Sequence, residues 1–400
     1  MGYWFDSINL DRYRVLPKRE AREYINVNPL QTGGVLTPEA RKALMEYADG
    51  YSICDYCLKG RLDMISKPPV DRFIEDLARF LDMDVARVTL GARESQFMVV
   101  HSLCKPGDIV VIDSLAHYTT YLAAERAGAT VVEVPHTGYP EFKIEPEKYA
   151  EKIEEVEKRY GKKPALVVLT HVDYKYGNLA DAEKVGKICR EYDVPFMLNC
   201  AYTVGRMPVS GKRLNADFIV ASGHKSMAAC GPVGVLATTR EYAKVVFRTS
   251  KIKGDWSGRS FPMKEVELLG CTARGAPLVT LMASFPYVVE RVKRWGEEVK
   301  KARYLVEQLE QIEGVRQLGI KPKQHDLIYF ETPCFYEISK KHKKRGFFLY
   351  HELKKRGIVG VQPGITKYVK LSTYGLTWGQ VEKVANAFLE IAREHGVNVG

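Results

Sequence analysis

The sequence predicts an α/β protein with a large domain, built on a mostly parallel seven-stranded sheet, and a small C-terminal α+β domain. Three observations support this prediction. Between residues 87 and 239, short runs rich in β-branched residues alternate with amphipathic stretches, as in strands joined by crossover helices. From about Tyr287 onward, long amphipathic stretches dominate. The length of 400 residues also exceeds the usual size of one domain.

The elements of the large domain follow one another in a regular order. Seven apolar segments are expected to be strands: residues 87–91, 109–113, 130–135, 165–172, 195–201, 218–221 and 233–239. Five segments with apolar residues three or four positions apart are expected to be helices: residues 71–83, 93–103, 118–127, 147–160 and 180–192. We therefore expect an N-terminal segment (1–70), a large domain (71–285) and a small domain (286–400).

The small domain is expected to open with one long charged helix. Its apolar stripe consists of Val288, Val292, Trp295, Val299, Ala302, Leu305, Leu309 and Ile312. A strand (326–331), a helix (347–355), a strand (367–373) and a final helix (377–394) are expected to follow.

Composition narrows the setting of the protein. No run of about 18 apolar residues occurs, and the first residues are too polar for a signal peptide, so we expect a cytoplasmic protein without a membrane span. Eight scattered cysteines favour reduced thiols over a disulfide framework. The net charge of +11 favours a polyanionic partner, although surplus lysine can also be ordinary solubilising surface. The densest basic run, residues 340–345 (KKHKKR), is either an RNA contact or a solvated loop.

The strongest chemical signal is a lysine directly after a predicted buried strand. In Ser222-Gly223-His224-Lys225, Lys225 can form a Schiff base with pyridoxal 5′-phosphate (PLP). Ser222, Gly223 and His224 would then lie beside the cofactor, with Ser222 and nearby backbone amides on its phosphate. Taken alone, the segment is more typical of a surface lysine at a strand end.

The other groups that PLP needs occur in chain order. Ala92 and Arg93 follow the first strand and open a helix whose N-terminal amides can bind a phosphate. His117 follows the second strand and can stack on the pyridine ring, and Asn199 ends the fifth strand, where a partner of the pyridine nitrogen is expected. Each has an ordinary structural explanation, but their joint order indicates a PLP site.

Three longer segments carry a family resemblance: residues 25–34 (INVNPLQTGG), 51–57 (YSICDYC) and 222–234 (SGHKSMAACGPVG). With them, the chain resembles fold type I PLP enzymes of the cysteine desulfurase group, and more closely the O-phosphoseryl-tRNA:cysteinyl-tRNA synthase family. The resemblance implies conversion of phosphoseryl-tRNA(Cys) to cysteinyl-tRNA(Cys) with a sulfur donor. It also implies a homodimer and leaves open a complex with the synthetase that charges the tRNA with phosphoserine.

Two positions depart from the wider fold type I pattern. Asn199 stands where most relatives have aspartate, and a neutral amide cannot stabilise a protonated pyridine nitrogen as a carboxylate does. Lys370 stands where cysteine desulfurases carry an arginine that clamps the substrate carboxylate. A weaker clamp fits a carboxyl group that is esterified to tRNA, although a simple basic substitution is the alternative. Groups that could hold the leaving phosphate are His171, Arg93, Lys251 and Lys253.

The cysteines carry a second signal. Cys54 and Cys57 form a Cys-x-x-Cys pair, which can be a redox dithiol, half of a zinc site or part of an iron–sulfur ligand set. Cys271 lies in a glycine-flanked loop. The family resemblance suggests that the three meet near the active site and either carry a persulfide or bind an iron–sulfur cluster. The alternative is that they are ordinary small buried residues.

Two other functions stay open from the sequence. A PLP-dependent cysteine desulfurase or lyase acting on free amino acids would share Lys225 and His117 but would need the arginine that Lys370 replaces. A non-catalytic RNA-binding or iron–sulfur scaffold protein would need no cofactor. The absorbance of bound PLP would exclude the scaffold.

Overall fold

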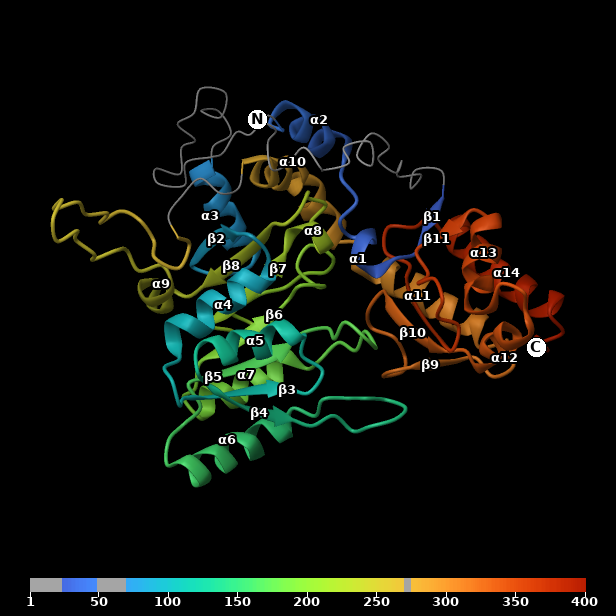
Figure 1. Ribbon diagram of the computed structural model, residues 1–400, viewed down its shortest axis with the longest axis horizontal. Coiled ribbons are helices and arrows are strands. Elements are labelled where there is room, and N and C mark those ends of the chain that lie inside the picture. The colour runs from blue at the N-terminus through green and yellow to red at the C-terminus, as the bar shows by residue number, and fades with distance from the viewer. Residues whose placement is uncertain (1–23, 49–69, 270–274) are drawn as a thin grey trace, which may run out of the picture.

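The computed structural model describes residues 24–48, 70–269 and 275–400 (Figure 1). A large sheet with helices on both faces lies beside a smaller unit made by the C-terminal part of the chain. In the described residues, no helix is long and apolar enough to cross a membrane.

Seven strands form the large sheet in the order β2-β8-β7-β6-β5-β3-β4. They are β2 (Val85–Thr89), β3 (Ile109–Asp113), β4 (Thr130–Val134), β5 (Leu166–Thr170), β6 (Phe196–Asn199), β7 (Phe218–Ser222) and β8 (Gly234–Thr238). Strands β3 to β7 run parallel, whereas β8 is antiparallel to its neighbours β2 and β7. The predicted seven-stranded, mostly parallel sheet is therefore confirmed. Because parallel strands end at the same edge, β3, β5, β6 and β7 bring their C-terminal residues together.

Helices cover both faces of this sheet, since alternate strand residues point to opposite sides. Val111 packs into one core with α3, α6, α7 and α10, while its neighbour Val110 packs into the other with α4, α5 and α9. These helices are α3 (Val70–Phe80), α4 (Ala92–Leu103), α5 (Tyr118–Arg126), α6 (Glu147–Tyr160), α7 (Ala182–Glu191), α9 (Arg240–Val246) and α10 (Gly275–Val292). The helices predicted in this region all form, within about three residues of the predicted ends.

The single long helix predicted after residue 287 is wrong, because the stripe is divided between two helices. Helix α10 ends at Val292, and α11 (Trp295–Leu309) begins after a two-residue break. Val288 belongs to the core of the large sheet, whereas Ala302 and Leu305 belong to the core of the C-terminal unit. One straight helix could not face both cores, although the apolar spacing continues across the junction.

The C-terminal unit contains a three-stranded antiparallel sheet in the order β12-β10-β9. Its elements are β9 (Arg316–Leu318), β10 (Leu327–Glu331), α12 (Pro333–Lys341), η3 (Arg345–Phe347), α13 (Phe348–Lys355), β11 (Ile358–Val359), β12 (Tyr368–Ser372) and α14 (Trp378–Glu394). β1 (Ile25–Asn26) pairs in parallel with β11, so the N-terminal segment joins this unit. The predicted boundary between the large and small domains, at residues 285 and 286, lies inside helix α10. The division of the chain at that point stays a prediction.

Two short elements connect the N-terminal segment to the large sheet. Helix α1 (Pro29–Thr32) follows β1 and contacts both β12 and α8 (Gly223–Ser226), which follows β7. Helix α2 (Pro38–Glu46) packs against α10. The N-terminal segment therefore reaches the turn that carries Lys225.

Candidate active site

Lys225 lies in the single helical turn that follows β7, at the edge where the parallel strands end. Its side chain is largely buried, and its Nζ atom lies 5.0 Å from the centre of the Tyr202 ring. Burial, with the charges of Arg206, Arg93 and Lys370 nearby, lowers the pKa of Lys225 to about 8. An amine with this pKa is about one tenth neutral at pH 7, and the neutral form is the nucleophile.

This lowered pKa predicts the pH dependence of labelling at Lys225. In protein freed of cofactor, acylation of Lys225 by a small anhydride should rise with pH with its midpoint near pH 8 and level off about one pH unit higher, because only the unprotonated amine reacts. Peptide mass spectrometry would measure the rate, with a blocked free lysine, whose pKa is about 10.4, as the comparison. A midpoint equal to that of the free lysine would contradict the prediction.

The N-terminus of α4 faces the same region. Gly91 precedes the helix with φ 128°, a conformation that L side chains rarely adopt, and it makes no side-chain cap. Among the described residues, no hydrogen bond is donated by the backbone N–H groups of Ala92, Arg93 and Glu94. Such free amides at a helix start form an anion site, and the guanidinium of Arg93 adds a positive charge. This donor set fits the phosphate of PLP, as the sequence predicts.

Ser222 and His224 complete the turn around Lys225. Ser222 is buried, and its Oγ lies 3.4 Å from Nδ1 of His224. The same nitrogen of His224 lies 3.0 Å from the carbonyl oxygen of Val233. The imidazole therefore ties the turn to the backbone just before β8, and burial lowers the pKa of His224.

His117 and Asn199 both lie at the C-terminal edge of the parallel strands. His117 caps α5, with Nδ1 accepting from the N–H of Thr119 at 3.3 Å, so Nε2 carries the proton of the neutral ring. Burial, together with the charges of Lys225 and Arg93, lowers the pKa of His117 to about 4. Asn199 is 4% exposed at the end of β6. The stacking role of His117 and the pairing role of Asn199 stay predictions.

The predicted substrate groups fall into two sets. Lys370 lies on β12, and its charge contributes to the lowered pKa of Lys225, so the two are neighbours. His171 is buried at the end of β5 with Nδ1 3.0 Å from Oγ1 of Thr203, and burial lowers its pKa to about 3. A neutral His171 offers a phosphate a hydrogen bond but no charge.

Lys251 and Lys253 are not beside Lys225 of the same chain. They lie on an exposed loop, and Figure 1 shows this loop after α9 projecting from the large sheet on the side away from the C-terminal unit. Cys54, Cys57 and Cys271 lie outside the described residues. Within the ranges 24–48, 70–269 and 275–400, no group of three or more His, Cys, Asp or Glu side chains is arranged to hold a metal ion.

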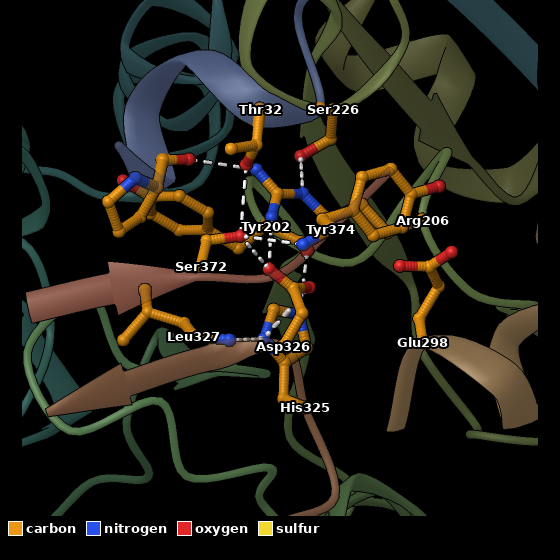
Figure 2. A network of polar contacts seen from close by, with 12 residues as sticks. Thr32, Tyr202, Arg206, Ser226, Glu298, His325, Asp326, Leu327, Ser372 and Tyr374 are labelled. Atoms are coloured by element: carbon orange, nitrogen blue, oxygen red, sulfur yellow. Dashed lines mark hydrogen bonds and ion pairs between the residues drawn. The ribbon is translucent and has the colours of Figure 1, made fainter. Parts of the chain in front are cut away.

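A buried ion pair behind Lys225 was missed by the sequence analysis (Figure 2). Arg206 and Asp326 are both fully buried, and Nη1 of Arg206 lies 2.6 Å from Oδ2 of Asp326. Arg206 also donates to the carbonyl oxygens of Lys225 at 3.1 Å and Pro29 at 2.9 Å, and to Oγ of Ser226 at 3.2 Å. One guanidinium thus joins α8, α1 and the start of β10.

Further bonds extend this network in both directions. Oγ of Ser372 donates to Asp326 at 2.5 Å and lies 3.0 Å from Oγ1 of Thr32 (Figure 2). Arg291 from α10 donates to the carbonyl oxygens of Gly33, at 3.0 Å, and of Ser226. Burial raises the pKa of Asp326, but the charges of Arg206 and His325 together with the hydrogen bond from Ser372 outweigh it, so the pKa lies below its ordinary value. Asp326 is therefore a charged partner.

Close backbone contact also fixes the Lys225 turn. A Cβ atom at Gly33 would lie 2.6 Å from the carbonyl oxygen of Lys225, and one at Gly34 would lie 1.9 Å from that of His224. Only glycine fits at these two positions, which explains why the segment 25–34 contains Gly-Gly. The one sequence signal for the network was a charged residue inside an apolar stretch, at Arg206.

Comparisons with known proteins place the chain in a family. Residues 96–393 match the model of the family described as O-phosphoseryl-tRNA(Sec) selenium transferase, SepSecS. The O-phospho-L-seryl-tRNA:Cys-tRNA synthase of Methanopyrus kandleri is 61% identical over 392 residues, which cover 98% of this chain and 100% of that protein. A crystal structure of a SepCysS–SepCysE N-terminal domain complex has a TM-score of 0.89 and 57% identity, covering 97% of this chain and 100% of the other.

More distant structures share the fold. A cysteine desulfurase from Thermococcus onnurineus has a TM-score of 0.74 at 21% identity, covering 93% of this chain and 96% of the other. Other structures with this fold contain PLP. The large sheet, with Lys225 in the helical turn after β7, therefore has the fold type I architecture of PLP-dependent enzymes. At 61% identity over nearly all of both chains, the chain belongs to the O-phospho-L-seryl-tRNA:Cys-tRNA synthase family.

Proposed function

We propose that the protein converts O-phosphoseryl-tRNA(Cys) to cysteinyl-tRNA(Cys) by PLP-dependent replacement of phosphate with sulfur. The observation that carries this proposal is the buried Lys225 amine, with its lowered pKa, close to the charge of Arg93 at the open N-terminus of α4. The family membership agrees with it. The reaction needs a base at Cα and positive or hydrogen-bonding groups at the phosphate.

The chain supplies the proton transfers and the orientation. Bound PLP supplies an electron sink that makes the Cα–H of an amino acid acidic. Lys225, freed by the substrate amine, is placed to accept that proton, and its pKa near 8 makes the neutral amine accessible at physiological pH. The proton held on Nζ can later be returned to product.

Asn199 orients the pyridine nitrogen with a neutral donor. Its Oδ1 accepts from the N–H of Ala201 at 3.2 Å, which leaves the Nδ2 group to donate. An amide donor would pair with an unprotonated pyridine nitrogen, so bound PLP would be a milder electron sink beside Asn199 than beside an aspartate. This suits elimination of phosphate, a good leaving group. An Asn199→Asp variant with much faster sulfur transfer would count against this role.

Lys370 predicts a preference for an esterified carboxyl group. Its single ammonium nitrogen, which donates to the carbonyl oxygen of Tyr174 at 3.2 Å, lacks the planar fork that forms the two parallel bonds of an arginine clamp. We expect phosphate release from phosphoseryl-tRNA to exceed release from free phosphoserine by at least about tenfold, and Lys370→Arg to narrow that ratio. Parallel phosphate assays with sulfide as donor would measure both. Equal rates for the two substrates would contradict the proposal that phosphoseryl-tRNA is the substrate.

We further propose that Cys54, Cys57 and Cys271 deliver the sulfur. The proposal rests on the Cys-x-x-Cys spacing and on the glycine-flanked loop of Cys271. Iron and sulfide analysis of anaerobically purified protein distinguishes an iron–sulfur cluster from a persulfide carrier. Alanine variants of the three cysteines should lose sulfur transfer while keeping phosphate release, and unchanged sulfur transfer would exclude this role.

A homodimer is the assembly that we propose. The loop after α9 exposes large apolar side chains, with Trp256 95% and Ile252 67% exposed, and a second subunit would cover them. Lys251 and Lys253 would then lie at the interface instead of beside Lys225 of their own chain. The partners that we propose outside the dimer are the tRNA, a sulfur donor and the synthetase that supplies phosphoseryl-tRNA. A SepCysE-like protein is a fourth proposed partner, by analogy with the complex of the structural relative. Sedimentation of the purified protein tests the dimer.

A further inference from the structure

A groove with a volume of about 770 Å³ lies between the N-terminal segment and the C-terminal unit. Its walls come from residues 24–31, from β10 and β12, and from the loop that follows β11. Figure 1 shows α1 and β1, which contribute to one wall, beside the C-terminal unit. None of the mechanistic roles assigned above uses the groove, apart from Lys370 at its edge.

One wall of the groove is the outer face of the β10–β12 pair. Tyr329 on β10 is opposite Lys370 on β12, and Tyr368 lies two residues before Lys370 on the same face. The side chains between them, Phe330 and Val369, point into the core of the C-terminal unit. The strand alternation therefore presents two tyrosines and a lysine to the groove.

The two tyrosines form an aromatic platform. The rings of Tyr329 and Tyr368 are stacked, with centroids 5.6 Å apart and an interplanar angle of 9°. Both side chains are only partly buried, so ring surface remains accessible. Tyr176 supports Tyr329 from below in an edge-to-face contact at 5.7 Å. A parallel, supported pair of rings is suited to stack a flat heterocycle.

The charged side chains that line the groove are positive, although Glu331 lies opposite Tyr368 in the β10–β12 pair. Lys370 and Lys175 line the groove, and Nζ of Lys367 lies 5.6 Å from the centre of the Tyr368 ring. No carboxylate is among the described residues that line the groove, whereas the amides of Asn26 and Gln31 are. Aromatic faces together with lysines and amides are the groups that bind single-stranded nucleic acid.

The groove is also close to the catalytic lysine. Lys370 is one of the charges that act on Lys225, and α1, which carries Gln31, contacts the α8 turn. A molecule in the groove could therefore extend a covalently attached group toward Lys225. In the basic run at residues 340–345, by contrast, Lys340 is paired with Glu337 on α12.

We propose that this groove binds the unpaired 3′-terminal nucleotides of the tRNA substrate, with bases stacked on Tyr329 and Tyr368 and phosphates contacted by Lys175 and Lys370. The inference rests on the proposed function and names the part of the substrate that the groove holds. It explains why an aromatic platform stands at the entrance to a site for a small amino acid. The terminal nucleotide carries the aminoacyl ester, which then reaches the Lys225 turn.

Binding of a short oligonucleotide tests the groove directly. A 5′-labelled ACCA oligonucleotide should bind the dimeric holoenzyme, measured by fluorescence anisotropy. Tyr329→Ala and Tyr368→Ala should each weaken its binding by about tenfold or more, because a stacked base is lost, while Tyr329→Phe and Tyr368→Phe should bind within about twofold of wild type. Tyr160→Ala, at an exposed tyrosine on α6, is the matched control.

Two further measurements distinguish a loss of groove binding from a folding defect and from failure of the proposed function. Lys175→Ala, at an exposed side chain, should flatten the salt dependence of oligonucleotide binding by about one phosphate contact. The ratio of kcat/KM for phosphoseryl-tRNA to that for phosphoserine methyl ester should fall about tenfold in the tyrosine-to-alanine variants. If the oligonucleotide binds the alanine variants as well as wild type, or if the ratio does not fall, the groove proposal fails. A wild-type enzyme that leaves phosphoseryl-tRNA intact would instead overturn the proposed function.

Discussion

Replacing Lys225 with alanine is expected to abolish phosphate release from phosphoseryl-tRNA, with a loss of at least about a thousandfold. The amine is the only group in the described turn that can both bond to the PLP carbonyl and move the Cα proton, so one substitution removes two functions. The visible absorbance of cofactor bound through lysine should disappear from the purified protein at the same time.

The control for this variant is a lysine of the same charge outside the site. Lys187 lies on α7, is exposed, and pairs with Glu183 at 3.2 Å. Lys187→Ala should therefore keep both the absorbance and the activity. Turnover by Lys225→Ala comparable to that of the control would remove the basis of the whole mechanism.

Replacing Arg206 with leucine is expected to destabilise the protein by about 3–5 kcal/mol. The substitution leaves the Asp326 carboxylate fully buried without its countercharge, which is the costly case for a buried ion pair. It also removes the bonds to the carbonyl oxygens of Lys225 and Pro29. Urea unfolding followed by circular dichroism would measure the loss.

Two companion variants show whether the uncompensated charge is the cause. Adding Asp326→Leu to Arg206→Leu removes both charges and should recover part of the lost free energy of unfolding. Arg213→Leu, at an exposed arginine 3.7 Å from Glu183, should cost less than about 1 kcal/mol. A loss in Arg206→Leu as small as that in Arg213→Leu would show that the buried pair contributes little.

The sequence predicted those parts of the site that local pattern determines. Lys225 and His117 follow strands of the parallel sheet and Asn199 ends one, and because such strands end at a common edge, their positions along the chain predicted that they lie at that edge. The N-terminus of α4 was predicted from the strand that precedes it.

The parts that the sequence could not predict depend on tertiary contacts. The Arg206–Asp326 pair joins residues 120 positions apart, and the periodicity of neither segment indicates a partner. The junction of α10 and α11 was missed because apolar spacing does not reveal which core a residue faces. The groove tyrosines stand on strands that were predicted, but their stacking requires the β10–β12 register.

The Arg206–Asp326 network also has a consequence for synthesis of the protein. Arg206 holds the Lys225 turn, but its ion-pair partner Asp326, and Ser372, which bonds to Asp326, belong to the C-terminal unit. During synthesis, the large sheet is complete at β8 before these two residues leave the ribosome. The full set of contacts around the Lys225 turn can therefore form only after β12 has been made.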